Sequence, residues 1–246
     1  MPFRLTSSTL TAILQPWSDV AQPIYRRVAQ LSDAEPGRET LWIGCGAGRS
    51  VLWWSERFKT LTEGVDPESA AIEEADEAAR KAGLSKLTSF QVADPTDLPH
   101  EDKVFDTVVV HMLHLPDPDG RKVLHEAGRV VRPMGTVIGI VPAWLQTPTP
   151  KDIKVVDKLG LRPQMGVEWK GFFREAGIVE LSVEEAAGDG KWMLQKTLAL
   201  LVRGWRAAGW LGVRAVMRYE VWALRRMARK RVLGLSIIKG SRWPHG

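Results

Sequence analysis

Three glycines at alternate positions constrain the fold of this chain more than any other feature. Gly44, Gly46 and Gly48 directly follow a short apolar run, in the stretch LWIGCGAGRS. The run predicts a buried strand and the residues after it predict a helix, so the glycines form the turn between the two. Such a turn lets a ligand lie against bare backbone near a helix N-terminus. A tight turn without a ligand would also use glycine, and Arg49 stands where the dinucleotide fingerprint has its third glycine.

Strand and helix patterns alternate along the first 190 residues. Strands are predicted from TLWIG, LTEGVD, LTSFQVAD, KVFDTVVVHML and GTVIGIVPA, and helices from RSVLWWSERF, PESAAIEEADEAARKAG and GRKVLHEAGRVVRP. A further helix and a sixth strand are predicted from WKGFFREAGIVELSVEEA, and a last strand from VLGLSIIKGSRW. This alternation predicts a doubly wound α/β sheet whose first strands are parallel.

A long helical insertion is predicted between the last two strands. Apolar residues from Val213 to Ala228 recur on one helical stripe, and arginines share another face. We therefore expect four parts: an N-terminal helical cover at 1–37, an α/β core at 38–190, the insertion at 191–231, and the last strand with the C-terminus at 232–246.

Charge is distributed unevenly between the body of the chain and its end. Residues 191–246 hold 13 Lys and Arg and one acidic residue, Glu220, whereas residues 1–190 carry a net charge of −7. The insertion is therefore expected to act as a lid over the active site, to contact an anionic membrane surface in addition, or to contact nucleic acid. Nucleic acid is disfavoured for two reasons. The segment HMLHLPDP, after the fourth strand, lacks two consecutive prolines followed by an aromatic ring that could stack on a base, and no RNA-binding motif is appended.

Two aspartates follow the strands next to the glycine turn. Asp66 ends the second strand and Asp94 follows the third. Ligands of open α/β sheets bind at the carboxyl ends of the strands, where a carboxylate about 20 residues after the glycines accepts hydrogen bonds from ribose hydroxyls. Asp94 is then placed to accept from an exocyclic amine. A single aspartate at a strand end would more simply cap a helix.

These motifs together resemble the class I S-adenosylmethionine-dependent methyltransferases. The likeness lies in LWIGCGAGRS, GVDPES, VADPTDLPHEDKVFDTVVVHMLHLPDP and EAGRVVRPMGTVIGIVP, and is strongest to the branch containing the quinone-biosynthesis methyltransferases. It implies a Rossmann-like seven-stranded sheet with a helical insertion between the last two strands, and S-adenosylmethionine as cofactor. The residues that the resemblance assigns to the cofactor are Tyr25, Gly44, Cys45, Gly46, Gly48, Asp66, Pro67, Ala93, Asp94, Pro95, His111 and Met112.

One position departs from the family pattern. Trp42 stands where the family usually has an acidic residue that helps to order the loop and the ammonium end of the ligand. The change implies weaker cofactor binding, a substitute acid from elsewhere, or a scaffold without activity. Since both aspartates and all three glycines are present, we favour a working enzyme.

Histidines at the end of the fourth strand are the candidate catalytic groups. A neutral imidazole suits proton removal from an acceptor, so His111 and His114 are candidates for a general base, unless they only cap the loop. Tyr25 either contributes a hydroxyl over the cofactor, as N-terminal helices of the family do, or simply packs. Cys45, the single cysteine, is interpreted as a small filler of the turn, and no metal site is predicted.

The sequence therefore predicts methyl transfer to a small, apolar acceptor such as a quinone precursor, another aromatic compound or a lipid. Two alternatives stay open: a methyltransferase acting on a thiol, metalloid or polar metabolite, and a non-catalytic protein of this fold that binds a membrane or partner through its basic end. The first 20 residues contain no uninterrupted apolar segment of signal-peptide type. We expect a cytoplasmic protein, with peripheral attachment to the inner membrane face left open.

Overall fold

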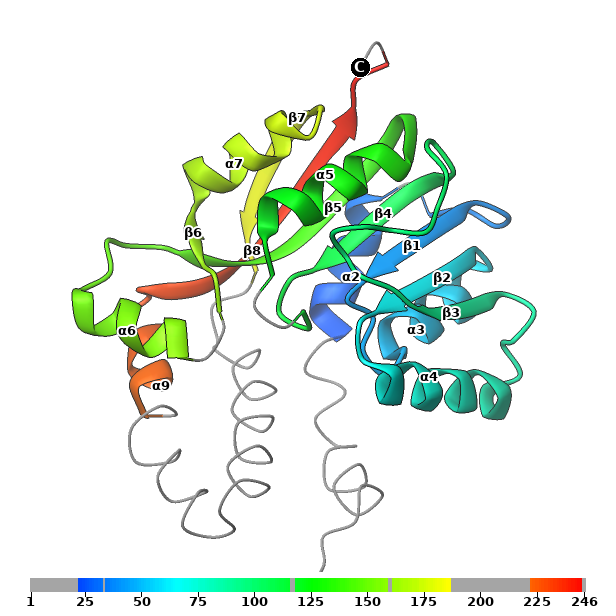
Figure 1. Cartoon of the computed structure of the whole chain (residues 1–246), viewed down its shortest axis with the longest axis horizontal. Coiled ribbons are helices and arrows are strands. Elements are labelled where there is room, and N and C mark those ends of the chain that lie inside the picture. The colour runs from blue at the N-terminus through cyan, green and yellow to red at the C-terminus, as the bar shows by residue number, and fades with distance from the viewer. Residues whose placement is uncertain (1–21, 33, 116–117, 159–160, 187–221, 245–246) are drawn as a thin grey trace, which may run out of the picture.

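The structure, a computed structural model, describes residues 22–32, 34–115, 118–158, 161–186 and 222–244. Its strands are β1 (Glu39–Ile43), β2 (Leu61–Asp66), β3 (Thr88–Val92), β4 (Phe105–His111), β5 (Val131–Trp144), β6 (Gln164–Met165), β7 (Ile178–Glu185) and β8 (Leu233–Arg242). Its helices are α2 (Gln22–Leu31), α3 (Arg49–Phe58), α4 (Ser69–Ala82), α5 (Gly120–Val130), α6 (Pro150–Lys158), α7 (Gly166–Glu175) and α9 (Trp222–Arg229). Figure 1 shows these elements around one twisted sheet.

The sheet has the order β3-β2-β1-β4-β5-β8-β7, with the two-residue β6 paired to β5. The strands from β3 to β5 pair in parallel, whereas β8 runs antiparallel to both of its neighbours. The strands that follow β1 in sequence therefore lie first on one side of it, as β2 and β3, and then on the other side, as β4 and β5. The carboxyl ends of β1, β2, β3 and β4 meet at one edge. The predicted fold class, a Rossmann-like sheet of the class I methyltransferase type, is confirmed.

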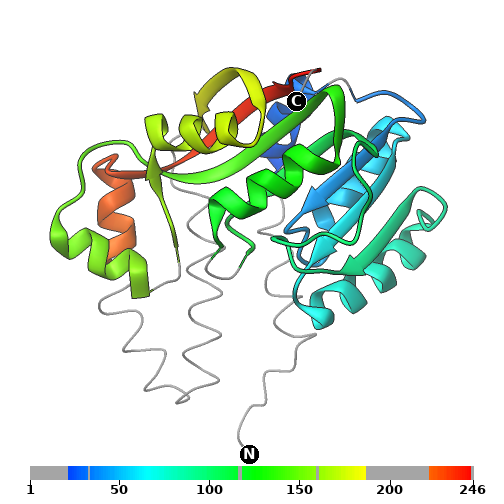
Figure 2. The ribbon, with the colours of Figure 1, turned by 45° about the horizontal axis from the view of Figure 1, so that its top comes forward.

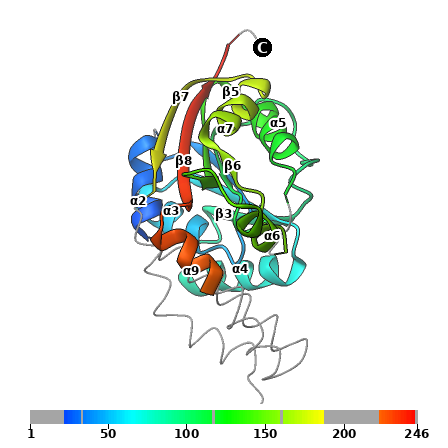
Figure 3. The same ribbon diagram turned by 90° about the vertical axis from the view of Figure 1, so that its left-hand side faces the viewer.

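Helices cover both faces of this sheet, and each face has its own apolar core. Successive residues of β1 point to opposite faces, so Leu41 and Ile43 pack with residues of α5 and α7, while Trp42 packs with residues of α2 and α3. Figure 3 shows α2 and α3 on one side of the sheet and α5 and α7 on the other. The continuous β-branched run of β4 is buried on both faces, as predicted.

Three local predictions differ from the structure. The helix expected up to Pro133 ends at Val130, and β5 begins at the next residue, since Val131 pairs with Phe105 of β4. Helix α6 and strand β6 were not predicted, because they follow a stretch rich in Pro and Thr that carries no clear period. They are formed by tertiary contacts with β5 and α9 instead of by a local signal.

The expected N-terminal cover and the insertion are described only in part. Helix α2 lies against β7, where Arg27 forms an ion pair with Glu184, and the rest of the predicted cover at 1–21 is outside the described residues. Of the predicted insertion, α9 is described and residues 191–221 are not. Helices α6 and α9 lie side by side at the end of the molecule away from α4 (Figures 1 and 2). Among the helices that the structure describes, none has the length and apolar character needed to cross a bilayer.

Candidate cofactor and active site

The glycine turn is held in place by the end of β2. The amides of Gly44 and Cys45 both donate to the carbonyl oxygen of Val65, at 2.9 and 3.1 Å. Gly44, Gly46 and Gly48 have φ angles of 77°, 53° and 73°, in the left-handed region that strongly favours glycine. The alternate glycines of the sequence are therefore explained by the backbone path of this turn.

The three glycines differ in what surrounds them. A Cβ at Gly44 would lie 2.8 Å from the carbonyl oxygen of His111, and one at Gly48 would lie 2.8 Å from the Cβ of Ala75. Protein atoms alone exclude side chains at both positions. At Gly46 the nearest atom would be Nδ1 of His114, at 3.4 Å, so this position is bounded by a side chain of the candidate site.

Asp66 is the carboxylate nearest the turn. Its Oδ2 accepts from the amide of Gly46 at 2.8 Å, and its Oδ1 accepts from the amide of Glu68 at 3.1 Å. The residue is 4% exposed, and burial raises its pKa, an effect that the two amide hydrogen bonds oppose. The carboxylate is thus fixed in orientation between the turn and α4, with further lone pairs for a ligand that donates hydrogen bonds.

Asp94 lies beside Asp66, because the amide of Ala93 donates to the carbonyl oxygen of Asp66 at 3.2 Å. Its Oδ1 accepts from the amide and the hydroxyl of Thr96, at 2.8 and 2.7 Å. These bonds lower the pKa of Asp94, whose side chain is exposed and ionised near neutral pH.

The two aspartates share one local geometry, which the sequence analysis did not identify. Each begins an Asp-Pro-x triplet whose third amide, from Glu68 or Thr96, donates to the Oδ1 of the aspartate. The repeated Asp-Pro pair was the available signal, since Asp side chains before a turn accept from the backbone two residues on. Thr96 is the additional residue of this site, because it orients the Asp94 carboxylate.

The two candidate histidines stack against each other at the end of β4. Their ring centroids are 3.8 Å apart and the ring planes differ by 20°. The Nδ1 of His114 lies 2.9 Å from the carbonyl oxygen of Gly44. A carbonyl only accepts, so in this contact Nδ1 carries the proton. The structure therefore brings both histidines to the glycine turn, with His111 buried and His114 against the turn.

The side chain of Trp42 lies in the core on the α2 and α3 side of the sheet. Its side chain is fully buried and lies edge-on to Tyr25 and to Trp54, with centroid distances of 5.8 and 5.5 Å. Tyr25 is buried in the same aromatic cluster. Burial raises its pKa to about 12, although the positive charge of Arg49 has the opposite effect. Tyr25 is thus placed beside the turn region by α2, with a neutral hydroxyl.

The other predicted cofactor contacts have mixed surroundings. Cys45 is 2% exposed, and burial followed by the charge of Asp66 raises its pKa, which agrees with a filler and not with a nucleophile. Met112 and Ala93 are buried in the core on the α5 side. Pro67 and Pro95 are half-buried, each inside one of the Asp-Pro-x turns.

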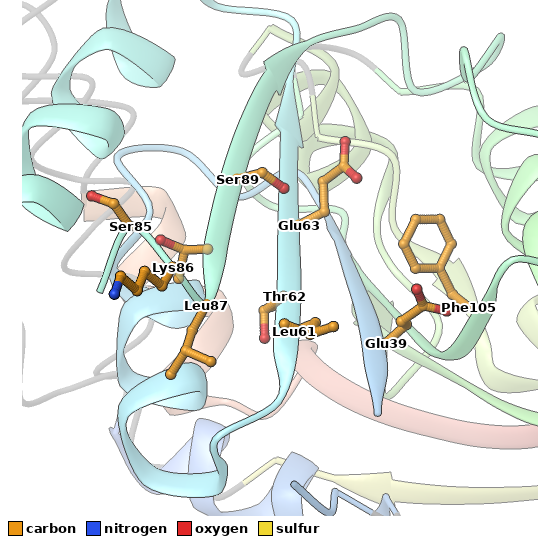
Figure 4. Close-up of a pocket in the computed structure, with 10 residues that line it drawn as sticks. Glu39, Leu61, Thr62, Glu63, Ser85, Lys86, Leu87, Ser89 and Phe105 are labelled. Carbon is orange, nitrogen blue, oxygen red and sulfur yellow. The ribbon is translucent and has the colours of Figure 1, made fainter. Parts of the chain in front are cut away.

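A separate hollow of about 320 Å³ lies at the opposite edge of the sheet (Figure 4). It is lined by the first residues of several strands, among them Glu39, Leu61, Thr88 and Phe105. Ligands of open α/β sheets bind at the carboxyl ends, so we assign this hollow no part in cofactor binding.

The fold and the site together define the class of protein. Residues 41–135 match the family described as a methyltransferase domain. The chain is 26% identical over 186 residues to 27-O-demethylrifamycin SV methyltransferase of Amycolatopsis mediterranei (strain S699), covering 70% of this chain and 67% of that protein.

Solved structures have the same architecture. A geranyl diphosphate methyltransferase in complex with SAM superposes with a TM-score of 0.74 at 19% identity, covering 98% of this chain and 92% of that one. The (4+2)-cyclase SpnF superposes with a TM-score of 0.73 at 22% identity, covering 91% and 82%. These likenesses establish the fold.

Residues 41–135 of this chain therefore match a methyltransferase domain within a sheet of the class I fold, and S-adenosylmethionine is the cofactor of that class. Its curated relatives align with it over part of their length. The matched share ranges from 33% to 67% among relatives that include a tocopherol O-methyltransferase and the rifamycin enzyme.

Proposed function

We propose that this protein transfers the methyl group of S-adenosylmethionine to a small apolar acceptor, such as a quinone precursor, another aromatic compound or a lipid. The observation that carries the proposal is the meeting of the glycine turn, Asp66, Asp94 and the histidine pair at the carboxyl ends of adjacent strands. When bound, the cofactor supplies an electrophilic methyl group on a sulfonium. The protein then has to orient the acceptor, exclude water and remove a proton where the acceptor carries one.

The donor set of the site fits a nucleoside. The Asp66 carboxylate is oriented by two backbone amides and would accept from the two ribose hydroxyls. The Asp94 carboxylate, oriented by Thr96, would accept from the adenine amine. The amino-acid end would then lie along the glycine turn, near Gly46 and the ring of His114.

His114 is the residue best placed to act as a general base. Because its Nδ1 donates to the carbonyl oxygen of Gly44, the lone pair of the neutral ring is on Nε2. The ring of His111 stacks on that of His114, with the ring centroids 3.8 Å apart. One proton taken from an acceptor can therefore be held by His114, while His111 supports the ring.

A buried apolar cluster lies beyond the end of β4, and it supports an apolar acceptor. Trp144 ends β5, four residues beyond Ile140, which pairs with His111 of β4, and it belongs to a buried cluster with residues of α6, α9 and β8. Members of this part of the cluster are Val155, Val156, Leu161, Ala186, Leu224, Met227 and Leu233. A thiol, metalloid or polar metabolite would gain little from an apolar environment.

Calorimetry with S-adenosylhomocysteine tests the cofactor site directly. Asp66→Asn is expected to weaken binding about 100-fold, since two hydrogen bonds to a charged acceptor are changed, and Asp94→Asn about tenfold. Asp97→Asn, an exposed carboxylate of the same loop, is the matched control and should leave the affinity unchanged. Wild-type affinity in Asp66→Asn, with an unchanged melting temperature, would show that the cofactor lies elsewhere.

Transfer of a labelled methyl group to a panel of phenols, quinols and lipids tests the reaction. His114→Asn retains an N–H donor for Gly44 but is no base, so we expect about a 100-fold lower kcat on hydroxyl acceptors with unchanged S-adenosylhomocysteine affinity. A wild-type rate in this variant would remove His114 from the chemistry.

The second candidate function is a protein of this fold that binds the cofactor without transferring its methyl group. Trp42 at the usual acidic position favours it, and a fold can host more than one function. Tight S-adenosylhomocysteine binding together with no labelled product from any acceptor in the panel would support this candidate over the first.

A further inference from the structure

Helix α9 presents a large aromatic side chain to solvent. Ala223, Leu224 and Met227 are buried against the core, whereas Trp222 on the opposite side of the helix is 62% exposed. Arg226 and Arg229 share the side of Trp222, because residues at i, i+4 and i+7 lie on one face of a helix. The guanidinium carbon of Arg226 lies 5.9 Å from the Trp222 ring centroid.

Helix α6 adds a second exposed apolar residue at the same end of the molecule. Ile153 is 42% exposed, and Lys151 and Lys154 beside it are exposed as well. Arg226 of α9 forms an ion pair with Asp152 of α6, whose side chain is only 4% exposed. This ion pair joins the two helices, which lie side by side (Figures 1 and 3). Their exposed residues are here named together the α6–α9 surface.

The charge of the α6–α9 surface is positive. Lys151, Lys154, Arg229 and Lys230 are exposed on it. Both acidic residues of α6 are engaged in ion pairs, Asp152 with Arg226 and Asp157 with Arg162.

We propose that the α6–α9 surface binds the face of an anionic lipid bilayer. Trp and Ile beside lysines and arginines are typical of segments that lie in a membrane interface, where the apolar side chains enter the headgroup layer and the cations contact lipid phosphates. An acidic protein or a nucleic acid would pair with the cations but would leave the exposed indole without a comparable environment. The inference is independent of methyl transfer, because it concerns binding alone.

Flotation of the full-length protein with vesicles tests the proposal. Vesicles of phosphatidylcholine and phosphatidylglycerol in equal parts should carry the protein at least about tenfold better than phosphatidylcholine alone. The double variant Lys151→Glu/Lys154→Glu should lose about 20-fold or more of this binding, since each basic residue near the surface contributes about fivefold.

A matched variant separates position from net charge. Lys86→Glu/Lys103→Glu changes the net charge by the same amount on exposed residues at the other end of the sheet, and should change flotation less than about twofold. Equal losses in the two double variants would overturn the assignment to the α6–α9 surface.

The apolar part of the contact has its own test. Trp222→Ala should reduce binding to the mixed vesicles about five- to tenfold, because an interfacial indole is removed. Trp243→Ala is the control, since Trp243 is 51% exposed but follows β8 at the opposite end of that strand. No flotation of the wild type with anionic vesicles, or tight binding to soluble double-stranded RNA instead, would overturn the proposal.

Discussion

The half of the sheet built on β1 to β4 and the half built on β5 to β8 are held together by different kinds of interaction. At the carboxyl ends of β1, β2 and β3, backbone amides donate to carbonyl and carboxylate oxygens of the same turn or of the adjacent strand end. In the other half, charged side chains join distant segments: Arg226 pairs with Asp152 across 74 residues, and Arg27 with Glu184 across 157.

This difference indicates which half tolerates changes of amino-acid sequence. The backbone geometry of the first half depends on glycine and aspartate at fixed positions, so the carboxyl ends of its strands tolerate little substitution. In the second half, side-chain pairs and apolar contacts can be exchanged without altering the path of the main chain. A fold divided in this way can keep the glycine turn while the contacts of the other half vary.

The largest effect that tests this contrast is expected for Gly48→Ala. The added Cβ would require a left-handed conformation and would lie 2.8 Å from Ala75 and from Phe90. We expect a loss of about 4 kcal/mol in the free energy of unfolding, from backbone strain and overpacking together. Urea denaturation of the purified variant measures this loss.

Gly177→Ala is the matched control in the other half. Gly177 has a similar φ of 74°, but no atom lies within 4 Å of the position of an added Cβ. Only the cost of the left-handed backbone conformation remains at Gly177, so we expect a loss of about 1 kcal/mol in the free energy of unfolding. Equal losses at the two glycines would mean that φ alone, and not close packing at the turn, requires glycine.

The second prediction concerns the ion pair between α6 and α9. Arg226→Met would leave Asp152 buried with its hydrogen bonds from Thr149 but without a counter-ion. We expect a loss of about 2 kcal/mol at pH 7. Arg162→Met is the control and should cost less than about 0.5 kcal/mol, because its partner Asp157 is 54% exposed.

The pH dependence of this loss follows from the pKa of Asp152. Burial raises that pKa, but the hydrogen bonds from Thr149 and the charge of Arg226 outweigh burial, so it lies below its ordinary value of 3.8. The stabilisation is therefore present above pH 3.8 and disappears as the pH falls through the lowered pKa. The difference between wild type and Arg226→Met should shrink below about pH 4, and a constant difference down to pH 3 would contradict the ion-pair explanation.

The contrast between the halves also explains what the sequence could predict. The strands, the glycine turn, and the positions of Asp66 and Asp94 were predictable, because each depends on a local pattern at a strand end. The end of α4 was predicted for the same reason: Gly83 has a left-handed φ of 69° and caps the helix.

Features that depend on distant segments were not predictable. Nothing near Asp152 in the sequence indicates Arg226, and nothing near His114 indicates that its ring would contact Gly44. The direction of the Trp42 side chain follows from the alternation of β1, but its aromatic partner Tyr25 comes from a separate helix.

The smallest expected effect is the difference in unfolding free energy between substitutions of two buried tryptophans, one in each half. Trp169 donates from Nε1 to the carbonyl oxygen of Pro142 at 2.9 Å, whereas Nε1 of Trp42 has no hydrogen-bond partner among the described residues. Both side chains are almost fully buried, so replacement by Phe removes a similar apolar area at either position. Trp169→Phe also leaves the Pro142 carbonyl without its donor, while Trp42→Phe removes an unpaired N–H. We therefore expect Trp169→Phe to cost about 1 kcal/mol more in the free energy of unfolding. A larger loss for Trp42→Phe would show that the indole at the usual acidic position makes a contribution of its own to the turn beside it.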